Sequence, residues 1–260
     1  ATSGPHVLVG GTTGSGKSEL LRTLVVSLAA SHPPEDVAVV LVDYKGGSAF
    51  AGLEDLPHIV GVVTDLDPAL TTRALTSLRA EIHRRETLLA RCGAADILAY
   101  RASSRRSPET LPHLARLVIV VDEFRALADE LPEFVTGLVR LAAVGRSLGI
   151  HLVLATQRPA GVVTADMRAN LGLRIALRVR DRGDSQDVIE SDAAARLPRS
   201  VPGRALLRWG GEPLVELQTA SVADPVAIPH QRVAVHWSDG TVTTRTFALE
   251  DAAPTTDLIA

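Results

Sequence analysis

The sequence predicts an α/β fold in which a mainly parallel central sheet is flanked by helices. Short apolar, β-branched runs alternate along the chain with longer segments of helical periodicity. The chain has 260 residues, 46% of them apolar, which is enough to bury the core of one large domain with a small extension. We expect residues 1–222 to form the main domain and residues 223–260 to form a β-hairpin and a linker.

Five buried strands and a first helix follow from this alternation. The predicted strands are Val7–Val9, Val37–Val42, Leu117–Val121, Ile150–Ala155 and Leu173–Val179. The first helix should follow the glycine-rich segment after the first strand, because apolar residues recur there with helical spacing. The residues expected on its buried face are Leu20, Leu21, Leu24, Val25 and Leu28.

A second helix is predicted to begin at Asp67-Pro68, since aspartate is a good N-cap and proline is favoured at the first helical position. The side chains expected to face inward are Leu75, Leu78, Ile82 and Leu89. The side chains expected to form a solvated face are Glu81, Arg84, Arg85 and Glu86.

Two segments after the second helix are predicted to be irregular or hairpin-like. The polar stretch 101–108 lacks periodicity and ends in proline, so it is predicted to be a mobile surface loop, with its arginines either solvated or touching a polyanion. Near the C-terminus, Val233–Trp237 and Val242–Phe247 flank Ser238-Asp239-Gly240, which predicts a hairpin with an Asp-Gly turn.

Composition argues against several functions. The net charge of −3 provides no general basic field for nucleic acid, and the 3% of aromatic residues offer little for base stacking. No apolar run is long enough to cross a bilayer, so we expect no membrane contact by this segment. The single Cys92 is interpreted as a structural thiol, and the scattered histidines show no metal-ligand spacing.

The strongest functional signal follows the first strand. Gly11, Gly16, Lys17 and Ser18 satisfy the pattern G-x-x-x-x-G-K-[ST] between a predicted strand and a predicted helix. Glycines let backbone N–H groups surround a phosphate, and the helix N-terminus adds a favourable dipole. The residues expected to bind the phosphates of a nucleotide are Gly11, Thr12, Thr13, Gly14, Ser15, Gly16, Lys17, Ser18 and Glu19. Lys17 should hold the β- and γ-phosphates, and Ser18 should ligate Mg²⁺.

A second signal is the apolar strand Leu117–Val121, which runs into Asp122 and Glu123. A carboxylate at the end of a buried strand is well placed for the Mg²⁺ shell, and an adjacent glutamate can polarise the attacking water. We therefore expect Asp122 to be a metal ligand and Glu123 to be the catalytic base.

Further catalytic candidates lie around the strand Ile150–Ala155. Gln157 follows this strand and is expected to orient the water or sense the γ-phosphate; otherwise it is only a polar strand end. Arg146 precedes the strand and is predicted to be an arginine finger for a neighbouring subunit, with Arg174 as the competitor. Asp43 and Lys45 either face the nucleotide or a neighbour, or form a structural ion pair at the adjoining glycines.

These motifs resemble the FtsK/SpoIIIE group of ring ATPases, and within it the ATPase domains of the type VII secretion motors EccC and EssC. The resemblance runs from about His6 to Val222, and its segments are Gly10–Ser18, Val42–Gly47, Leu56–His58, Val121–Phe124, Gly145–His151, Ala155–Pro159 and Val188–Arg204. The segments that look like the secretion branch rather than the DNA-pumping branch are Val42–Gly47, Pro132–Phe134, Asp192–Ala194 and Pro202–Arg204.

The resemblance implies a RecA-like core of the ASCE class, MgATP, a hexameric ring when active, and neighbouring ATPase domains in the same polypeptide. It also implies a secreted substrate protein and a position at the cytoplasmic face of the plasma membrane, behind membrane helices. The chain then looks like an excised first ATPase domain, which should hydrolyse ATP slowly when isolated. The alternatives are an FtsK-like translocase acting on duplex DNA and a nucleotide-binding regulatory module with little turnover.

Overall fold

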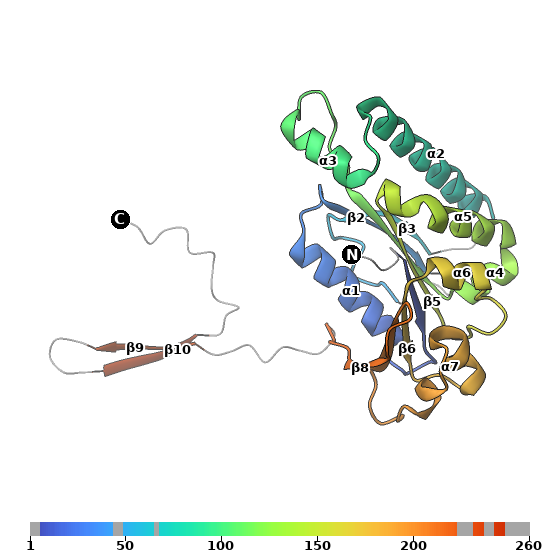
Figure 1. Cartoon of the computed structure of the whole chain (residues 1–260). Coiled ribbons are helices and arrows are strands. Elements are labelled where there is room, and N and C mark those ends of the chain that lie inside the picture. The colour runs from blue at the N-terminus through green and yellow to red at the C-terminus, as the bar shows by residue number, and fades with distance from the viewer. Residues whose placement is uncertain (1–5, 44–48, 65–67, 223–230, 237–241, 248–260) are drawn as a thin grey trace. The chain divides into compact units, whose positions relative to one another are not determined.

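The structure is a computed structural model that describes residues 6–43, 49–64, 68–222, 231–236 and 242–247. By their internal contacts the residues divide into two units, Ala1–Val222 and Ala223–Ala260. The first unit holds a large sheet with helices on both faces, and the second holds a two-stranded hairpin (Figure 1). No helix in the described ranges is long and apolar enough to cross a membrane.

The central sheet of the first unit has eight strands in the order β3-β2-β4-β5-β1-β6-β7-β8. The strands are β1 (Val7–Gly10), β2 (Val37–Asp43), β3 (Ile59–Val63), β4 (Arg116–Asp122), β5 (Ile150–Thr156), β6 (Leu173–Leu177), β7 (Arg204–Trp209) and β8 (Val215–Gln218). The strands from β3 to β6 in this order pair in parallel, whereas β7 and β8 are antiparallel to their neighbours. The predicted mainly parallel sheet is confirmed, and all five predicted strands belong to it.

Helices cover both faces of this sheet. The helices are α1 (Lys17–Ser31), α2 (Pro68–Cys92), α3 (Ile97–Arg106), α4 (Phe124–Glu130), α5 (Pro132–Leu148), α6 (Ala165–Asn170) and α7 (Arg182–Ile189), with a short 3₁₀ helix, η1 (Ala193–Arg196). Figure 1 shows α1 on one side of the sheet and α2, α5, α6 and α7 on the other. The predicted start of the second helix at Pro68 is confirmed, while Asp67 and Lys45 lie outside the described residues.

The two helical layers produce two apolar cores, because successive side chains of a strand point to opposite faces. On β1, Leu8 belongs to the core under α2 to α7, whereas its neighbour Val9 belongs to the core under α1. Leu21 and Val25 of α1 are fully buried in the second core, as their spacing predicts. Burying each such side chain contributes about 2 kcal/mol to folding. The central strands are therefore packed on both faces, and this packing fixes the positions of their ends.

The prediction of a mobile loop at residues 101–108 is wrong. Residues as far as Arg106 belong to α3, which Asp96 caps by accepting a hydrogen bond of 2.9 Å from the N–H of Ala99. Arg101 is buried and forms an ion pair with Asp36, which directly precedes β2. Arg105 and Arg106 are exposed in the last turn. Arg101 therefore has a structural partner that lies far away in the sequence.

The predicted solvated face of α2 is also wrong at one position. Arg85 is buried, with its Nε donating to Glu81 at 2.7 Å and its Nη1 donating to the carbonyl of Leu148 at 2.9 Å. Burial lowers the pKa of Arg85 from its ordinary value, while the Glu81 carboxylate opposes that shift. Arg85 thus anchors α2 to the end of α5.

Three strands of the sheet were not predicted. β3 carries exposed Val60 and Val62 and lies at one edge, while β7 and β8 extend the other edge. The second unit contains β9 (Gln231–His236) paired antiparallel with β10 (Val242–Phe247), so the predicted hairpin strands are confirmed. The predicted Asp-Gly turn lies outside the described residues.

Candidate nucleotide-binding site

The glycine-rich loop after β1 has backbone angles that only some residue types tolerate. Gly14 has φ of 73° and Gly16 has φ of 96°, in the left-handed region that glycine adopts without strain. A Cβ on Gly16 would lie 2.7 Å from the backbone nitrogen of Gly203, and one on Gly11 would lie 2.6 Å from the Ser15 hydroxyl. A side chain at Gly11 or at Gly16 would therefore collide with neighbouring atoms, so both positions favour glycine.

Backbone hydrogen bonds connect this loop to three strands. The N–H of Gly11 donates to the carbonyl of Thr156 at the end of β5, at 3.1 Å, and the N–H of Thr12 donates to the carbonyl of Arg178 after β6, at 3.0 Å. The N–H of Gly203, just before β7, donates to the carbonyl of Ser15 at 2.8 Å. The loop is thus held at the carboxyl edge of the parallel strands, where open α/β sheets bind ligands.

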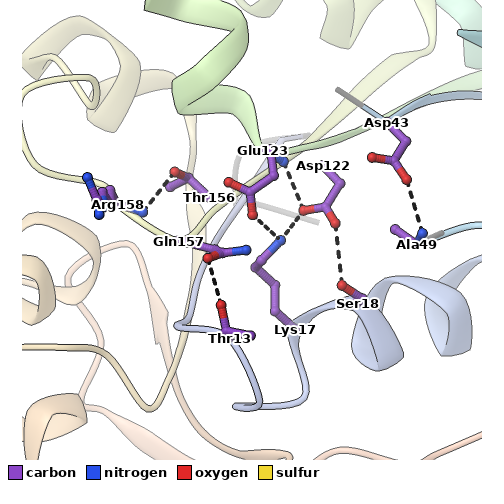
Figure 2. Close-up of polar contacts among 10 residues, drawn as sticks. All are labelled: Thr13, Lys17, Ser18, Asp43, Ala49, Asp122, Glu123, Thr156, Gln157 and Arg158. Atoms are coloured by element: carbon purple, nitrogen blue, oxygen red, sulfur yellow. Dashed lines mark hydrogen bonds and ion pairs between the residues drawn. The ribbon is translucent and has the colours of Figure 1, made fainter. Parts of the chain in front are cut away.

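Three charged side chains meet beside the loop (Figure 2). The ammonium of Lys17 pairs with Asp122 and lies 3.3 Å from Oε1 of Glu123. All three side chains are buried, with relative exposures of 4% for Lys17, 5% for Asp122 and 6% for Glu123. The Ser18 hydroxyl lies 3.4 Å from Oδ2 of Asp122. The structure therefore brings together the predicted phosphate-binding lysine, the predicted metal ligands and the predicted catalytic base. These residues come from the start of α1 and from the end of β4.

Glu123 has an unusual backbone conformation. It lies between β4 and α4 with φ of 57° and ψ of 44°, a left-handed conformation that disfavours a residue with a side chain. Its N–H donates to Oδ1 of Asp122 at 2.9 Å, which holds this turn. The turn directs the Glu123 carboxylate toward Lys17 (Figure 2). Such strain persists where the surrounding structure enforces it and is frequent at functional sites.

The residues present fit a magnesium-bound nucleotide. The hydroxyl of Ser15 is buried and has no hydrogen-bond partner among the described residues, although it lies within the glycine-rich loop. The Lys17 ammonium can hold phosphate oxygens, and the Ser18 hydroxyl and Asp122 carboxylate are oxygen ligands of the kind that Mg²⁺ prefers. When bound, the metal would neutralise phosphate charge. Glu123, which lies beside Lys17, is the group that can accept a proton.

Gln157 lies next to the loop, as expected from its place after β5. Its Oε1 accepts a hydrogen bond of 2.9 Å from the hydroxyl of Thr13 (Figure 2). This contact links the end of β5 directly to the phosphate loop. A side chain in this position can respond to a group bound by the loop.

The two candidate arginine fingers have different surroundings. Arg146 is exposed in the last turn of α5, at the amino end of β5, which is the opposite edge of the sheet from Gln157. The seven residues of β5 span about 20 Å, so Arg146 is remote from the phosphate loop of its own chain. Arg174 is buried on β6, with Nη1 at 3.1 Å from Glu190. This ion pair holds Arg174 within its own domain.

Asp43 occupies the position for which the sequence left two interpretations open. It ends β2 in register with Asp122 of β4, at the same sheet edge as the charged cluster. Its Oδ2 accepts a hydrogen bond of 3.0 Å from the N–H of Ala49 (Figure 2). Because Asp43 is buried, this hydrogen bond fixes the position of Ala49 relative to the end of β2.

Glu19, predicted only as part of the loop, has contacts that the sequence did not indicate. Its Oε1 accepts hydrogen bonds from the hydroxyl of Ser221 at 3.1 Å and from the N–H of Val222 at 2.8 Å. One turn later, the Thr23 hydroxyl donates to the carbonyl of Ala220 at 3.0 Å. The first turns of α1 therefore hold the last residues of the first unit, and no local pattern could have shown this pairing of distant segments.

The fold and the site define a P-loop NTPase domain in which β5 separates the loop-bearing strand β1 from the acidic strand β4. The chain belongs to the FtsK/SpoIIIE family, whose model matches residues 1–161. Members of this family are P-loop ATPases, so nucleotide binding is a property of the class.

Relatives and solved structures place the chain within this family. It is 44% identical over 214 residues to the type VII secretion system protein EssC of Staphylococcus aureus, a match that covers 82% of this chain and 14% of that protein. The structure resembles the cytoplasmic domain of the Thermomonospora curvata type VII secretion ATPase EccC, with a TM-score of 0.80 and 41% identity over 85% of this chain and 26% of that one. It also resembles ATPases 2 and 3 of T. curvata EccC in complex with a signal sequence peptide, with a TM-score of 0.74 and 31% identity over 85% of this chain and 39% of that one. The chain therefore spans only a small part of the length of its curated relatives.

Proposed function

We propose that this domain binds and hydrolyses MgATP as part of a type VII secretion motor and so drives or regulates the export of substrate proteins. The observation that carries the proposal is the buried cluster of Lys17, Asp122 and Glu123 beside the phosphate loop. The similarity to EssC and EccC supports the secretion role. We further propose that the domain is the first of several ATPase domains in one polypeptide.

In this proposal each polar group has a separate task. Lys17 holds the terminal phosphates, while Ser18 and Asp122 hold the metal. Glu123 accepts a proton from the attacking water, and Gln157 orients that water or senses the terminal phosphate. Arg146 enters the site of a neighbouring subunit, so full turnover requires assembly, for which we propose a hexameric ring at the cytoplasmic face of the plasma membrane.

The alternative DNA translocase has less support than the sequence suggested. The motif 155–159 is present, but Arg101 of the predicted basic loop is paired with Asp36 in the interior of the domain. A regulatory module remains the alternative in which ATP binds without turnover. The test therefore has three arms, in which the protein receives substrate peptide, duplex DNA or no addition.

The test measures ATP binding and steady-state hydrolysis, with the chain alone and within the polypeptide that carries the adjoining ATPase domains. Glu123→Gln should retain ATP binding and lower hydrolysis by about 10²-fold or more, because it removes the proton acceptor. The matched control is Glu109→Gln, at an exposed position outside the site, which should leave both quantities unchanged. Stimulation by a signal sequence peptide supports the export motor.

Equal hydrolysis by wild type and Glu123→Gln would contradict the assignment of the base. Stimulation by duplex DNA in place of the peptide would move the function to a translocase. Tight ATP binding without turnover in every arm would identify a regulatory module.

A further inference from the structure

The last residues of the first unit, 219–222, follow β8 and lie against the first turns of α1; we call this segment the strap. Oε1 of Glu19 accepts hydrogen bonds from the N–H of Val222 at 2.8 Å and from the hydroxyl of Ser221 at 3.1 Å. The hydroxyl of Thr23 donates to a carbonyl of the strap at 3.0 Å. Two side chains of α1 therefore hold a segment that is about 200 residues away in the sequence.

The strap is also connected to the phosphate loop from the other side. The N–H of Thr219 donates to the carbonyl of Gly203 at 2.9 Å, and the N–H of Gly203 donates to the carbonyl of Ser15, within the loop, at 2.8 Å. A Cβ on Gly203 would lie 2.6 Å from the Thr219 hydroxyl, so this approach leaves no room for a side chain. Backbone hydrogen bonds thus join the strap to the loop, while Glu19 and Thr23 join it to the helix that follows the loop.

The amino end of α1 is a place where such a support is needed. Its N-cap position is Gly16, which has no side chain, and no other side chain that the structure describes caps this helix end. The N–H groups left open in the first turn are the donors that a phosphate would receive. A side-chain cap would occupy the same donors. The first turn must therefore be fixed by side chains that point away from the phosphate loop.

Apolar packing holds α1 against the sheet but does not set the position of its first turn along the helix axis. Leu21 is fully buried, yet apolar contact is non-directional. Hydrogen bonds require a narrow range of distances and angles. Glu19 and Thr23 are one turn apart and share a face of the helix, so their bonds to the strap fix α1 along its axis. Lys17 and Ser18 directly precede Glu19 and are fixed with it.

We propose that Glu19 is a positioning residue of the nucleotide site, an inference that rests on the proposed binding of MgATP. By holding the strap, Glu19 keeps Lys17 and Ser18 in the positions in which they can hold phosphate and Mg²⁺. The coupling is reciprocal: if the strap contact raises the affinity for nucleotide, bound nucleotide must stabilise the strap contact by the same factor. The last residues of the first unit therefore respond to occupation of the phosphate loop.

Direct electrostatics predicts the opposite sign of effect. If Glu19 acted on the nucleotide only through its charge, its carboxylate would repel the phosphates, and removing it would raise the affinity. If Glu19 acts through the strap, removing it should lower the affinity. Thr23 carries no charge, so its bond to the strap tests positioning without any change in electrostatics.

The test first measures the affinity of the 260-residue chain for a non-hydrolysable ATP analogue in the presence of Mg²⁺. Glu19→Ala and Thr23→Val should each lower this affinity about fivefold or more, as expected for coupling between two sites. Glu19→Gln keeps an oxygen that can accept the strap N–H, so it should bind the analogue about as tightly as the wild type. The matched control is Glu109→Ala, which removes an exposed carboxylate outside the site and should leave the affinity unchanged.

Amide hydrogen exchange of Val222 is the second readout, because its N–H donates to Glu19. In the wild type, the analogue should slow this exchange about fivefold or more. Glu19→Ala should speed up the exchange in the absence of the analogue and abolish the response to it. A purely structural role of Glu19 would speed up the exchange without changing the affinity for the analogue.

Higher affinity in Glu19→Ala would show direct charge repulsion and would overturn the proposal. Unchanged affinity in Thr23→Val, or exchange of Val222 that does not respond to the analogue in the wild type, would also overturn it. If the wild type bound no analogue, the proposed function would fail and this inference with it. Normal binding by the wild type and by all variants would refute the positioning role alone.

Discussion

Lys17 has a structural role in addition to its proposed phosphate contact. Its ammonium lies among the buried carboxylates of Asp122 and Glu123, which would otherwise be two negative charges away from water. Leaving a buried charge without its partner is strongly unfavourable. The residue that we propose to hold phosphate therefore also offsets one of the two carboxylate charges.

Replacing Lys17 should consequently destabilise the domain as well as abolish ATP binding. Lys17→Ala is expected to lower the free energy of unfolding by about 3 kcal/mol, measured by urea denaturation at about pH 7 without nucleotide. Adding Glu123→Gln to that variant should restore part of the loss, because one of the two uncompensated charges is removed. An unchanged urea midpoint for Lys17→Ala would show that the cluster is not a stabilising one.

Gly16 is the glycine of the loop with the strictest requirement. Its φ of 96° and the 2.7 Å that would separate an added Cβ from the nitrogen of Gly203 both exclude a side chain. Gly16→Ala should lower the free energy of unfolding by about 2 kcal/mol or more, since left-handed backbone alone costs a residue about 1 kcal/mol. Gly14→Ala is the matched control: Gly14 has φ of 73° but no atom within 4 Å of the added Cβ. Thermal denaturation of both variants tests this, and equal losses would rule out the contact with Gly203.

At the scale of the elements, His6 connects the start of β1 to α5 and β5. Its Nε2 donates to the carbonyl of Ala142 at 2.9 Å, and its Nδ1 accepts from the N–H of Leu152 at 3.0 Å. The side chain is fully buried, and burial lowers the pKa of His6 from 6.5 to about 4. A neutral imidazole therefore joins three elements of the core.

This lowered pKa predicts the pH dependence of stability. The unfolded chain binds a proton at His6 near pH 6.5, whereas the folded protein binds it only near pH 4. Stability is therefore fully present above pH 6.5 and declines as the pH falls toward 4, by up to about 3 kcal/mol. Urea midpoints measured from about pH 7.5 to about pH 4.5 should show a smaller decline in His6→Gln than in the wild type. His32→Gln, at an exposed position, should leave the decline unchanged; a wild-type slope in His6→Gln would contradict the assignment.

For the whole molecule, the position of Arg146 predicts that turnover depends on assembly. Arg146 lies at the edge of the sheet opposite its own phosphate loop, so its proposed target is the site of a neighbour. Arg146→Ala should lower ATP hydrolysis by about 10³-fold in the assembled polypeptide and leave the rate of the isolated chain unchanged. Steady-state hydrolysis across a range of protein concentrations measures this.

Arg174→Ala is the comparison that separates the two candidate fingers. Because Arg174 pairs with Glu190 inside its own domain, its removal should lower stability in the isolated chain. A loss of assembled hydrolysis in Arg174→Ala without any loss of stability would assign the finger to Arg174 instead.

The sequence pattern predicted the features that are formed by residues close together in the sequence. The apolar runs of β1, β2, β4, β5 and β6 predicted buried parallel strands, since strands covered on both faces need continuous apolar side chains. The phosphate loop and the Asp122-Glu123 pair were also visible, because the strand, loop and helix that form them are consecutive. Their meeting at one sheet edge follows from the parallel arrangement.

Tertiary structure alone decided the features that join distant segments. Arg101 and Arg85 read as solvated charges, and only their distant partners Asp36 and the Leu148 carbonyl explain their burial. Likewise, the bonds from Ser221 and Val222 to Glu19 depend on how the chain returns to α1. The sequence by itself determined five of the buried strands and the place of the glycine-rich loop, since periodicity and glycine spacing are local. Which charged groups face each other depends on the packing of the whole domain, because ion pairs and shared cavities are formed across the fold.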